Sequence, residues 1–165
     1  MTEPIIVEGD LLDQSVDVIV NAWNRNIIPW WLLLPQGVSG AIKRKAGYGP
    51  FVELGRFGSI GLGEAAITGP GKLSCKAIIH VAGINLCWVA TRESIQKSVI
   101  SAIKIVNDRN YGSIAFPVIG AGTGGFSESG ALELMMEALN TLPTKAEVII
   151  VKYRKLRKIR SSEGD

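Results

Sequence analysis

Glycines gather at one point late in the chain. Gly120, Gly122, Gly124 and Gly125 fall within six residues, between an apolar run ending at Val118 and a helical pattern. Glycine lets the backbone adopt positive φ angles and approach a phosphate closely. Glycines also lose much conformational entropy on folding, and in a loop without a ligand nothing would offset that loss. The segment therefore predicts a phosphate-binding loop. It matches neither the P-loop, which needs a following Gly-Lys-Ser/Thr, nor the Rossmann fingerprint of a first βα unit.

A second glycine turn precedes another helical pattern. Gly37 and Gly40 flank Val38 and Ser39, and residues 38–46 continue as a short helix. Exposed N–H groups and the positive end of the helix dipole make such a corner a site for an anion. Two corners of this kind predict two phosphates.

Polar side chains follow the ends of two predicted strands. Asp10 follows residues 4–7 and can accept a hydrogen bond from the amine of adenine, although Gly-Asp is also common as a turn or cap. Asn21 and Asn24 end the apolar run of residues 17–21. We interpret Asn21 as structural, whereas Asn24 either faces ribose hydroxyls and a water or satisfies backbone groups in a loop. With the two corners, these residues describe a ligand like ADP-ribose better than a mononucleotide.

A sheet and several helices must hold these residues in place. Short apolar runs alternate with helical patterns, which is typical of an α/β domain. The pattern predicts strands at residues 4–7, 17–21, 64–68, 76–81, 113–118 and 146–151, and helices at 38–46, 91–108 and 127–139. With these six strands and roughly four helices in all, three of which have the bounds given, we predict a three-layer α/β/α sandwich with a central mixed sheet. The pattern does not fix the order of the strands.

The composition is that of one globular domain. The chain has 165 residues, of which 47% are apolar and 20% are charged, so it can bury a sizeable core. We expect no transmembrane helix and no signal peptide, and a cytoplasmic location, because the sequence lacks a long apolar run and a basic, then apolar, N-terminus. Cys75 and Cys87 lack metal-ligand spacing, so we expect free thiols and no metal site.

Positive charge is concentrated in the last residues. Residues 152–165 hold six basic and two acidic residues, which leaves 12 basic and 13 acidic residues in the remainder. We therefore divide the chain into a domain at residues 1–151 and a basic tail at residues 152–165. The tail is either a solvated, partly helical end or a contact for nucleic acid or another polyanion.

Taken in order, these motifs resemble those of the macro domain family from about residue 5 to residue 151. The similar segments are Gly9-Asp10-Leu11, DVIVNAWN from Asp17 to Asn24, GVSGAI from Gly37 to Ile42, EAAIT from Glu64 to Thr68, IIHV from Ile78 to Val81, and Ser113 to Phe126. Each motif alone is weak, whereas the set is specific. The resemblance implies an ADP-ribose site that needs no cofactor.

The resemblance also implies a role for each site residue. Asp10 would contact adenine, Asn24 would face the distal ribose, and Phe126 would pack near that ribose, while His80 would be structural. The corner at Gly37 to Ser39 would line one phosphate and the distal ribose, and the corner at Gly120 to Gly125 would hold the other phosphates. The implied ligand-binding residues are Asp10, Leu11, Ala22, Asn24, Gly37, Val38, Ser39, Gly120, Ala121, Gly122, Thr123, Gly124, Gly125 and Phe126, of which Asn24 and Ser39 are the candidate catalytic residues.

The sequence departs from the family pattern in two places. Many hydrolytic members carry an acidic residue, often given a role in activating water, where Ser39 stands, although some viral hydrolases lack it. The family's glycine run is replaced by a longer apolar stretch from Ile27 to Gln36 that includes Trp30 and Trp31. This stretch packs on the protein body, covers the ligand or binds a protein partner.

Three functions follow as alternatives. The first is hydrolysis at the distal ribose of mono-ADP-ribosyl protein, ADP-ribosylated nucleic acid or O-acetyl-ADP-ribose, with water positioned by Asn24 and the substrate's own phosphate assisting as base. The second is a non-catalytic ADP-ribose reader, which the missing acid at Ser39 favours. The third is a phosphatase acting on ADP-ribose 1''-phosphate or a related nucleotide, which only the basic tail favours.

Overall fold

The computed structural model describes residues 3–32 and 37–155, and a sheet of six strands lies at its centre. The strands are β1 (Ile5–Gly9), β2 (Val18–Trp23), β3 (Ala65–Thr68), β4 (Ala77–Ala82), β5 (Ser113–Pro117) and β6 (Glu147–Tyr153). Their order is β1-β6-β5-β2-β4-β3, and β3 pairs antiparallel to β4 while the other pairs are parallel. The mixed sheet is therefore confirmed, with the 4–7 strand at one edge and the 17–21 strand in the middle.

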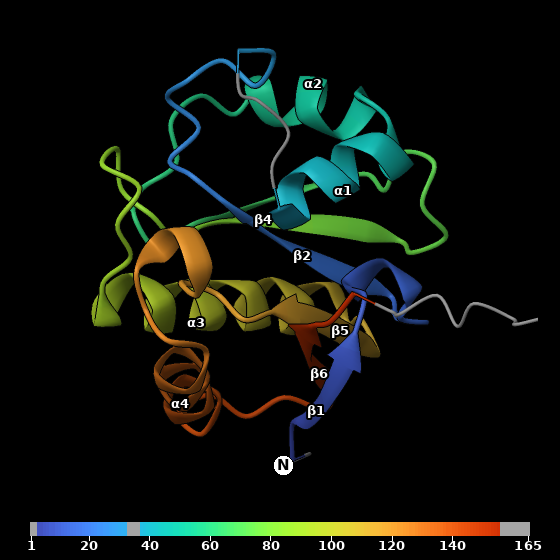
Figure 1. Ribbon diagram of the computed structural model, residues 1–165. Helices are drawn as coiled ribbons and strands as arrows, with labels where there is room; N and C mark the ends of the chain where they lie inside the picture. The colour runs from blue at the N-terminus through green and yellow to red at the C-terminus, as the bar shows by residue number, and fades with distance from the viewer. Residues whose placement is uncertain (1–2, 33–36, 156–165) are drawn as a thin grey trace, which may run out of the picture.

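Helices cover both faces of this sheet. They are α1 (Gly37–Ala46), α2 (Gly49–Gly55), α3 (Arg92–Arg109) and α4 (Glu128–Leu139), with short 3-10 turns η1 (Leu11–Asp13) and η2 (Gly122–Gly124). Figure 1 shows α1 and α2 above the sheet and α3 and α4 below it. The predicted three-layer sandwich is confirmed. Within the described ranges, no helix combines the length and the apolar character that crossing a membrane requires.

Side-chain caps fix where the two long helices begin. The Thr91 hydroxyl accepts a hydrogen bond from the N–H of Ser94, and the Ser94 hydroxyl accepts one from the N–H of Thr91, which is a capping box. Ser127 caps α4 by accepting from the N–H of Gly130. Helix α3 ends at Asn110, whose φ of 55° is left-handed.

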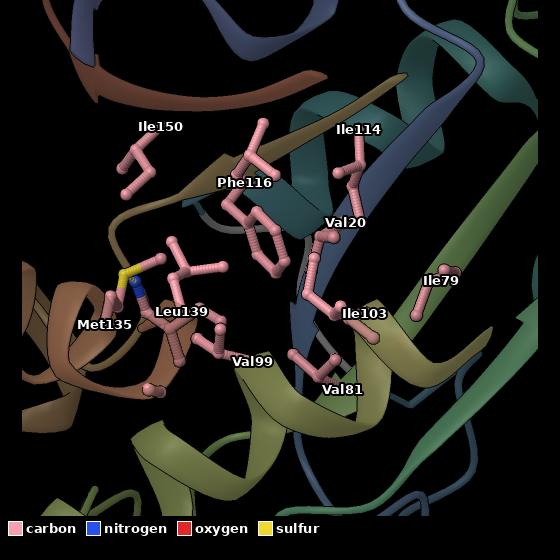
Figure 2. Packing of buried hydrophobic residues seen from close by; sticks show 14 of the residues in the cluster. Val20, Ile79, Val81, Val99, Ile103, Ile114, Phe116, Met135, Leu139 and Ile150 are labelled. Carbon is pink, nitrogen blue, oxygen red and sulfur yellow. Dashed lines mark hydrogen bonds between the residues drawn. The ribbon is translucent and has the colours of Figure 1, made fainter. Parts of the chain in front are cut away.

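Alternating side chains of the central strands pack into two hydrophobic cores, one on each face of the sheet. Val18 and Val20 of β2 pack with α3 and α4, whereas Ile19 and Trp23 pack with α1 and α2. Figure 2 shows the first core, where side chains from β2, β4, β5 and β6 meet those of α3 and α4. Since β2 is apolar on both faces, it needs a helical layer on each side.

The sequence pattern did not predict α2, and it ended the last strand two residues too early, at residue 151 instead of Tyr153. Helix α2 has only seven residues, with Pro50 in its first turn, so it offers too few turns for a helical period to be seen. Strand β6 continues through Lys152 and Tyr153, which pair with Glu8 and Gly9 of β1. These two residues, assigned to the tail by the charge pattern, lie in a strand.

Candidate functional site

The candidate residues meet along one edge of the sheet. Strands β1, β6, β5, β2 and β4 are parallel, so their carboxyl ends share that edge. Asp10 follows β1, the loop at residues 118–126 follows β5, and Asn24 follows β2. Because β5 neighbours β2 and β1 lies beyond β6, the loop stands between Asp10 and Asn24 along the edge. Open α/β sheets bind their ligands at this edge.

The loop at residues 118–126 folds on itself and leaves some backbone donors unused. The N–H groups of Ala121, Gly125 and Phe126 donate to carbonyls within the loop, and the Gly124 carbonyl accepts from Ala90. The N–H groups of Gly120 and Thr123 have no acceptor among the residues that the structure describes. Backbone donors of this kind are what an anion would use.

Glycine serves two different purposes in this loop. Gly122 and Gly125 have φ angles of 70° and 88°, and a Cβ atom at either position would meet no heavy atom within 4 Å. The space beside them is therefore open. Gly120, with φ of 87°, lies under Ile95, whose Cδ1 atom would be 2.5 Å from a Cβ. Gly120 is thus required by packing as well as by its backbone angle.

The first turn of α1 forms the second glycine corner. Gly37 has a φ of 54° and open space where a Cβ would stand. The N–H groups of Gly37, Val38 and Ser39 belong to the first helical turn, which has no intrahelical acceptors. Pro35 and Gln36, which precede the helix in the predicted corner, lie outside the described residues.

Ser39 is tied to the end of β2 rather than free. Its hydroxyl donates to the Asn21 Oδ1 atom at 2.7 Å and to the Ala22 carbonyl at 3.1 Å. Ser39 is half-buried, so part of its surface still faces solvent. A hydroxyl whose proton is already used by the protein cannot act as an acid toward a ligand.

Asn21 continues this contact into a buried chain of hydrogen bonds. Its Nδ2 atom lies 3.0 Å from His80 Nδ1, and His80 Nε2 lies 2.9 Å from the Thr68 hydroxyl, which lies 3.1 Å from the Gly69 carbonyl. Asn21 and His80 are register partners in β2 and β4, and both are fully buried. Burial lowers the pKa of His80 to about 3, so its imidazole is neutral at physiological pH.

Asn24 lies just past β2 and is almost completely buried. Its Oδ1 atom accepts a hydrogen bond from the N–H of Asn26 at 2.7 Å. Asn26 has a left-handed φ of 57°, and its amide donates to the carbonyls of Leu54 and Gly58. The Asn24 oxygen is therefore used by the turn, and its Nδ2 group makes no hydrogen bond within the described part of the chain.

Asp10 and Leu11 occupy the far end of the edge. The Asp10 Oδ1 atom accepts from the N–H of Leu12 at 2.8 Å, so this carboxylate caps η1 as the turn interpretation expects. Its second oxygen makes no hydrogen bond among the described residues and can serve a ligand. The Leu11 side chain is buried in the core, so only its main chain can reach one.

The two tryptophans of the apolar stretch have different surroundings. Trp30 is half-buried, its ring lies 5.5 Å from that of Tyr48 between centroids, and it also contacts Gly55. Trp31 is 67% exposed. Packing thus accounts for Trp30 but not for Trp31, and residues 33–36 of this stretch lie outside the described ranges.

Lys43 lies within the predicted helix at residues 38–46, and no sequence motif singles it out. Its ammonium donates to the Trp30 carbonyl at 2.8 Å and lies 5.1 Å and 5.0 Å from the ring centroids of Trp23 and Phe51. Burial lowers the pKa of Lys43. The cation fixes the apolar stretch to α1, and nothing in the local sequence signals this contact.

Two hollows lie beside the site rather than in it. One of about 380 Å³ is lined by residues 26–31, Val52 and Gly55. Another of about 540 Å³ is lined by Arg92, Glu93, Lys97 and their neighbours on α3, and none of the predicted site residues lines it. The open glycine corners, and the loop N–H groups that have no acceptor among the described residues, lie instead at the carboxyl edge.

Comparisons with known proteins agree with this arrangement. A family model described as the Macro domain matches residues 20–135. An O-acetyl-ADP-ribose deacetylase of Escherichia coli is 30% identical over 148 residues, covering 85% of this chain and 80% of that protein. A macro domain-containing protein of Listeria monocytogenes is 37% identical over 142 residues, covering 81% and 77%.

Solved structures show the same likeness. A mutant macrodomain of Oceanobacillus iheyensis with ADPR superposes with a TM-score of 0.77 at 25% identity, covering 92% of this chain and 85% of that one. The macrodomain of that organism with ADP has a TM-score of 0.75 at 25% identity, covering 92% and 83%.

Proposed function

The chain belongs to the macro domain family, and on that premise we propose that it binds ADP-ribose along the carboxyl edge of its sheet and hydrolyses a linkage at the distal ribose. The observation that carries the proposal is the pair of open glycine corners, at Gly37 and at Gly122 to Gly125, beside backbone N–H groups that have no acceptor among the described residues. Relatives whose names or solved complexes include ADP-ribose compounds support the same ligand class.

The order of groups along the edge sets the direction of the ligand. Adenine would lie at Asp10, the diphosphate would bind the N–H groups of the two corners, and the distal ribose would lie by Asn24, Ser39 and Phe126. The distance between β1 and β2, which are separated by β6 and β5, suits an extended dinucleotide-like ligand rather than a mononucleotide. The loop after β5 stands between the two ends, where a diphosphate would be.

Hydrolysis would use positioning more than acid–base chemistry. The Asn24 Nδ2 group would hold a water for attack on the carbon at the distal ribose linkage. The bond from that carbon to the acceptor then breaks, the acceptor leaves with the electron pair, and the water proton passes to a diphosphate oxygen. Orientation and electrostatic contacts of this kind can supply a large share of a barrier reduction.

A reader that binds without cleaving is the second candidate. Ser39 favours it, because its proton is held by Asn21 and Ala22 and it carries no charge to activate water. Titration calorimetry with ADP-ribose tests both candidates, and turnover of O-acetyl-ADP-ribose and of mono-ADP-ribosyl protein separates them. Absence of heat at high micromolar ADP-ribose would contradict the enzyme and the reader alike.

The Asn24→Ala variant tests the catalytic assignment. We expect turnover to fall at least about tenfold, the scale of one positioned polar group (about 1–3 kcal/mol). Asn140→Ala is the matched control, because Asn140 is an exposed asparagine at the C-terminal end of α4. If both variants keep wild-type turnover while ADP-ribose binds, Asn24 is not part of the mechanism.

A further inference from the structure

The buried chain of hydrogen bonds has a direction that is set at the end far from the site. The Thr68 hydroxyl lies 3.1 Å from the Gly69 carbonyl, which can only accept, so its proton is directed there. Thr68 must then accept from His80 across their 2.9 Å contact. His80 therefore carries its proton on Nε2, and its Nδ1 atom is an acceptor.

The same direction continues through β2 to the surface. With Nδ1 as the acceptor, Asn21 turns its Nδ2 group toward His80 and its oxygen toward Ser39. Ser39 then donates its single proton inward, to that oxygen and to the Ala22 carbonyl. What Ser39 offers to the solvent side is lone pairs alone. Burial supports this arrangement because it keeps His80 neutral, with one donor and one acceptor.

The opposite direction would be poorer on two counts. A proton on Nδ1 would require Thr68 to donate to Nε2, which would leave the Gly69 carbonyl without this partner. Asn21 would also turn its Nδ2 group toward Ser39 and occupy one of the serine lone pairs. The Nε2–H direction also supplies a donor to the Gly69 carbonyl, and buried polar groups favour such complete pairing.

We propose that Thr68 and His80 act as positioning residues that keep the Ser39 oxygen an acceptor only, so that the site selects a free hydroxyl on the distal sugar. This inference rests on the proposed function, because it needs the distal ribose to lie beside Ser39. A sugar whose hydroxyl is acylated or missing at that point has no proton to donate, and it would lose the contact.

The test compares the affinities of two ligands and measures the tautomer of His80 directly. ADP lacks the distal ribose and carries an extra charge on its terminal phosphate, so the change that a variant makes in the ratio of the two affinities separates that sugar from general damage to the fold. His80 is the only histidine in the chain, so long-range proton–nitrogen NMR of its ring needs no assignment. We expect the Nε2–H tautomer in the free wild-type protein.

Three variants change the two ends of the buried chain of hydrogen bonds, at Ser39 and at Thr68. Ser39→Ala should weaken ADP-ribose about fivefold, the loss of one hydrogen bond, and leave ADP unchanged. Thr68→Val removes the acceptor of the Nε2 proton, so we expect the Nδ1–H tautomer and a loss of about threefold for ADP-ribose alone. Thr68→Ser keeps the hydroxyl and should retain both the tautomer and the affinity ratio.

Each outcome has one meaning. An Nδ1–H tautomer in the wild-type protein overturns the direction of the chain whether or not a nucleotide binds. An equal loss for ADP and ADP-ribose in Ser39→Ala overturns the selection of the sugar hydroxyl. Failure of the wild-type protein to bind either nucleotide overturns the proposed function. The proposed selection of a sugar hydroxyl then fails as well, even when the expected tautomer is present.

Discussion

At the scale of single residues, His80 is the group whose burial has the clearest measurable consequence. Its ring contacts Asn21, Thr68 and, edge-on, the ring of Phe51, none of which carries a charge. No charged group among the described residues contacts the ring to stabilise the imidazolium, so burial excludes the proton from the folded state.

The stability of the protein should therefore fall with acidification before its carboxylates titrate. The pKa of His80 is about 3 in the folded state and 6.5 in the unfolded chain, so the unfolded chain binds the proton first. We expect the free energy of unfolding to drop by about 1.4 kcal/mol for each pH unit between about pH 6 and about pH 3, the window set by the two pKa values. Urea unfolding at pH 7, 6 and 5 measures this slope.

A variant without the histidine is the control for this slope. In His80→Gln the amide keeps one donor and one acceptor but does not titrate, so its stability should be flat between pH 6.5 and 5. Equal slopes in the two proteins would show that another group is responsible.

At the scale of elements, the loop after β5 combines a glycine that the fold needs with glycines that the proposed ligand would need. Gly120 lies against Ile95 of α3, whereas Gly122 faces open space at the carboxyl edge. The same residue type thus serves packing at one position and access at the other.

A pair of alanine variants separates these two purposes. Gly120→Ala should destabilise the fold by about 1–3 kcal/mol, because its Cβ would overlap the Ile95 side chain. Gly122→Ala should cost only about 1 kcal/mol of backbone strain, yet weaken ADP about tenfold by moving the loop donors away from the phosphates. Thermal unfolding and calorimetry with ADP measure the two effects. Wild-type ADP affinity in Gly122→Ala would remove this loop from the proposed site.

The apolar stretch after Asn24 offers a second matched pair. Trp30 packs against Tyr48 and Gly55, so Trp30→Ala should lower the free energy of unfolding by about 1–3 kcal/mol. Trp31 is mostly exposed, so Trp31→Ala should change it by less than about 0.5 kcal/mol. Urea unfolding of both variants checks this. Comparable losses would mean that Trp31 also packs on the protein.

At the scale of the whole molecule, the last strand stabilises the end of the sheet where the proposed adenine contact lies. Arg154 donates through its backbone N–H to the Gly9 carbonyl, and its guanidinium contacts Glu128 of α4 at 2.9 Å and Glu8 at 3.6 Å. Gly9 is followed directly by Asp10 and η1. The end of β6 thus fixes the turn that carries the proposed adenine contact.

Two truncations test where the domain ends. A chain ending at Lys155 keeps β6 and Arg154, so we expect its melting temperature and ADP-ribose affinity to match those of the full chain. A chain ending at Val151 loses the pairs of Lys152 and Tyr153 with β1, and should melt several degrees lower and bind ADP-ribose more weakly. If the first truncation abolishes binding, the basic tail takes part in it.

Much of the fold was determined by local sequence. The apolar period of residues 91–108, capped at Thr91, predicts α3, and the continuous apolar run at Asp17 to Asn21 predicts a strand covered on both faces. These signals can be read from a single sequence, because an element that buries one face or both faces carries apolar residues at a regular spacing. The two glycine corners were also visible, because few residues other than glycine adopt their backbone angles.

The tertiary structure alone decided which polar groups meet. Ser39 and Asn21 are 18 residues apart, and Asn21 and His80 are 59 apart, so no local spacing predicts their contact. Likewise, Lys43 reads as a surface lysine until Trp23, Phe51 and the Trp30 carbonyl surround it. Spacing along the chain records which face of an element is buried, whereas partners across elements are fixed by strand order and register, which the pattern left undetermined.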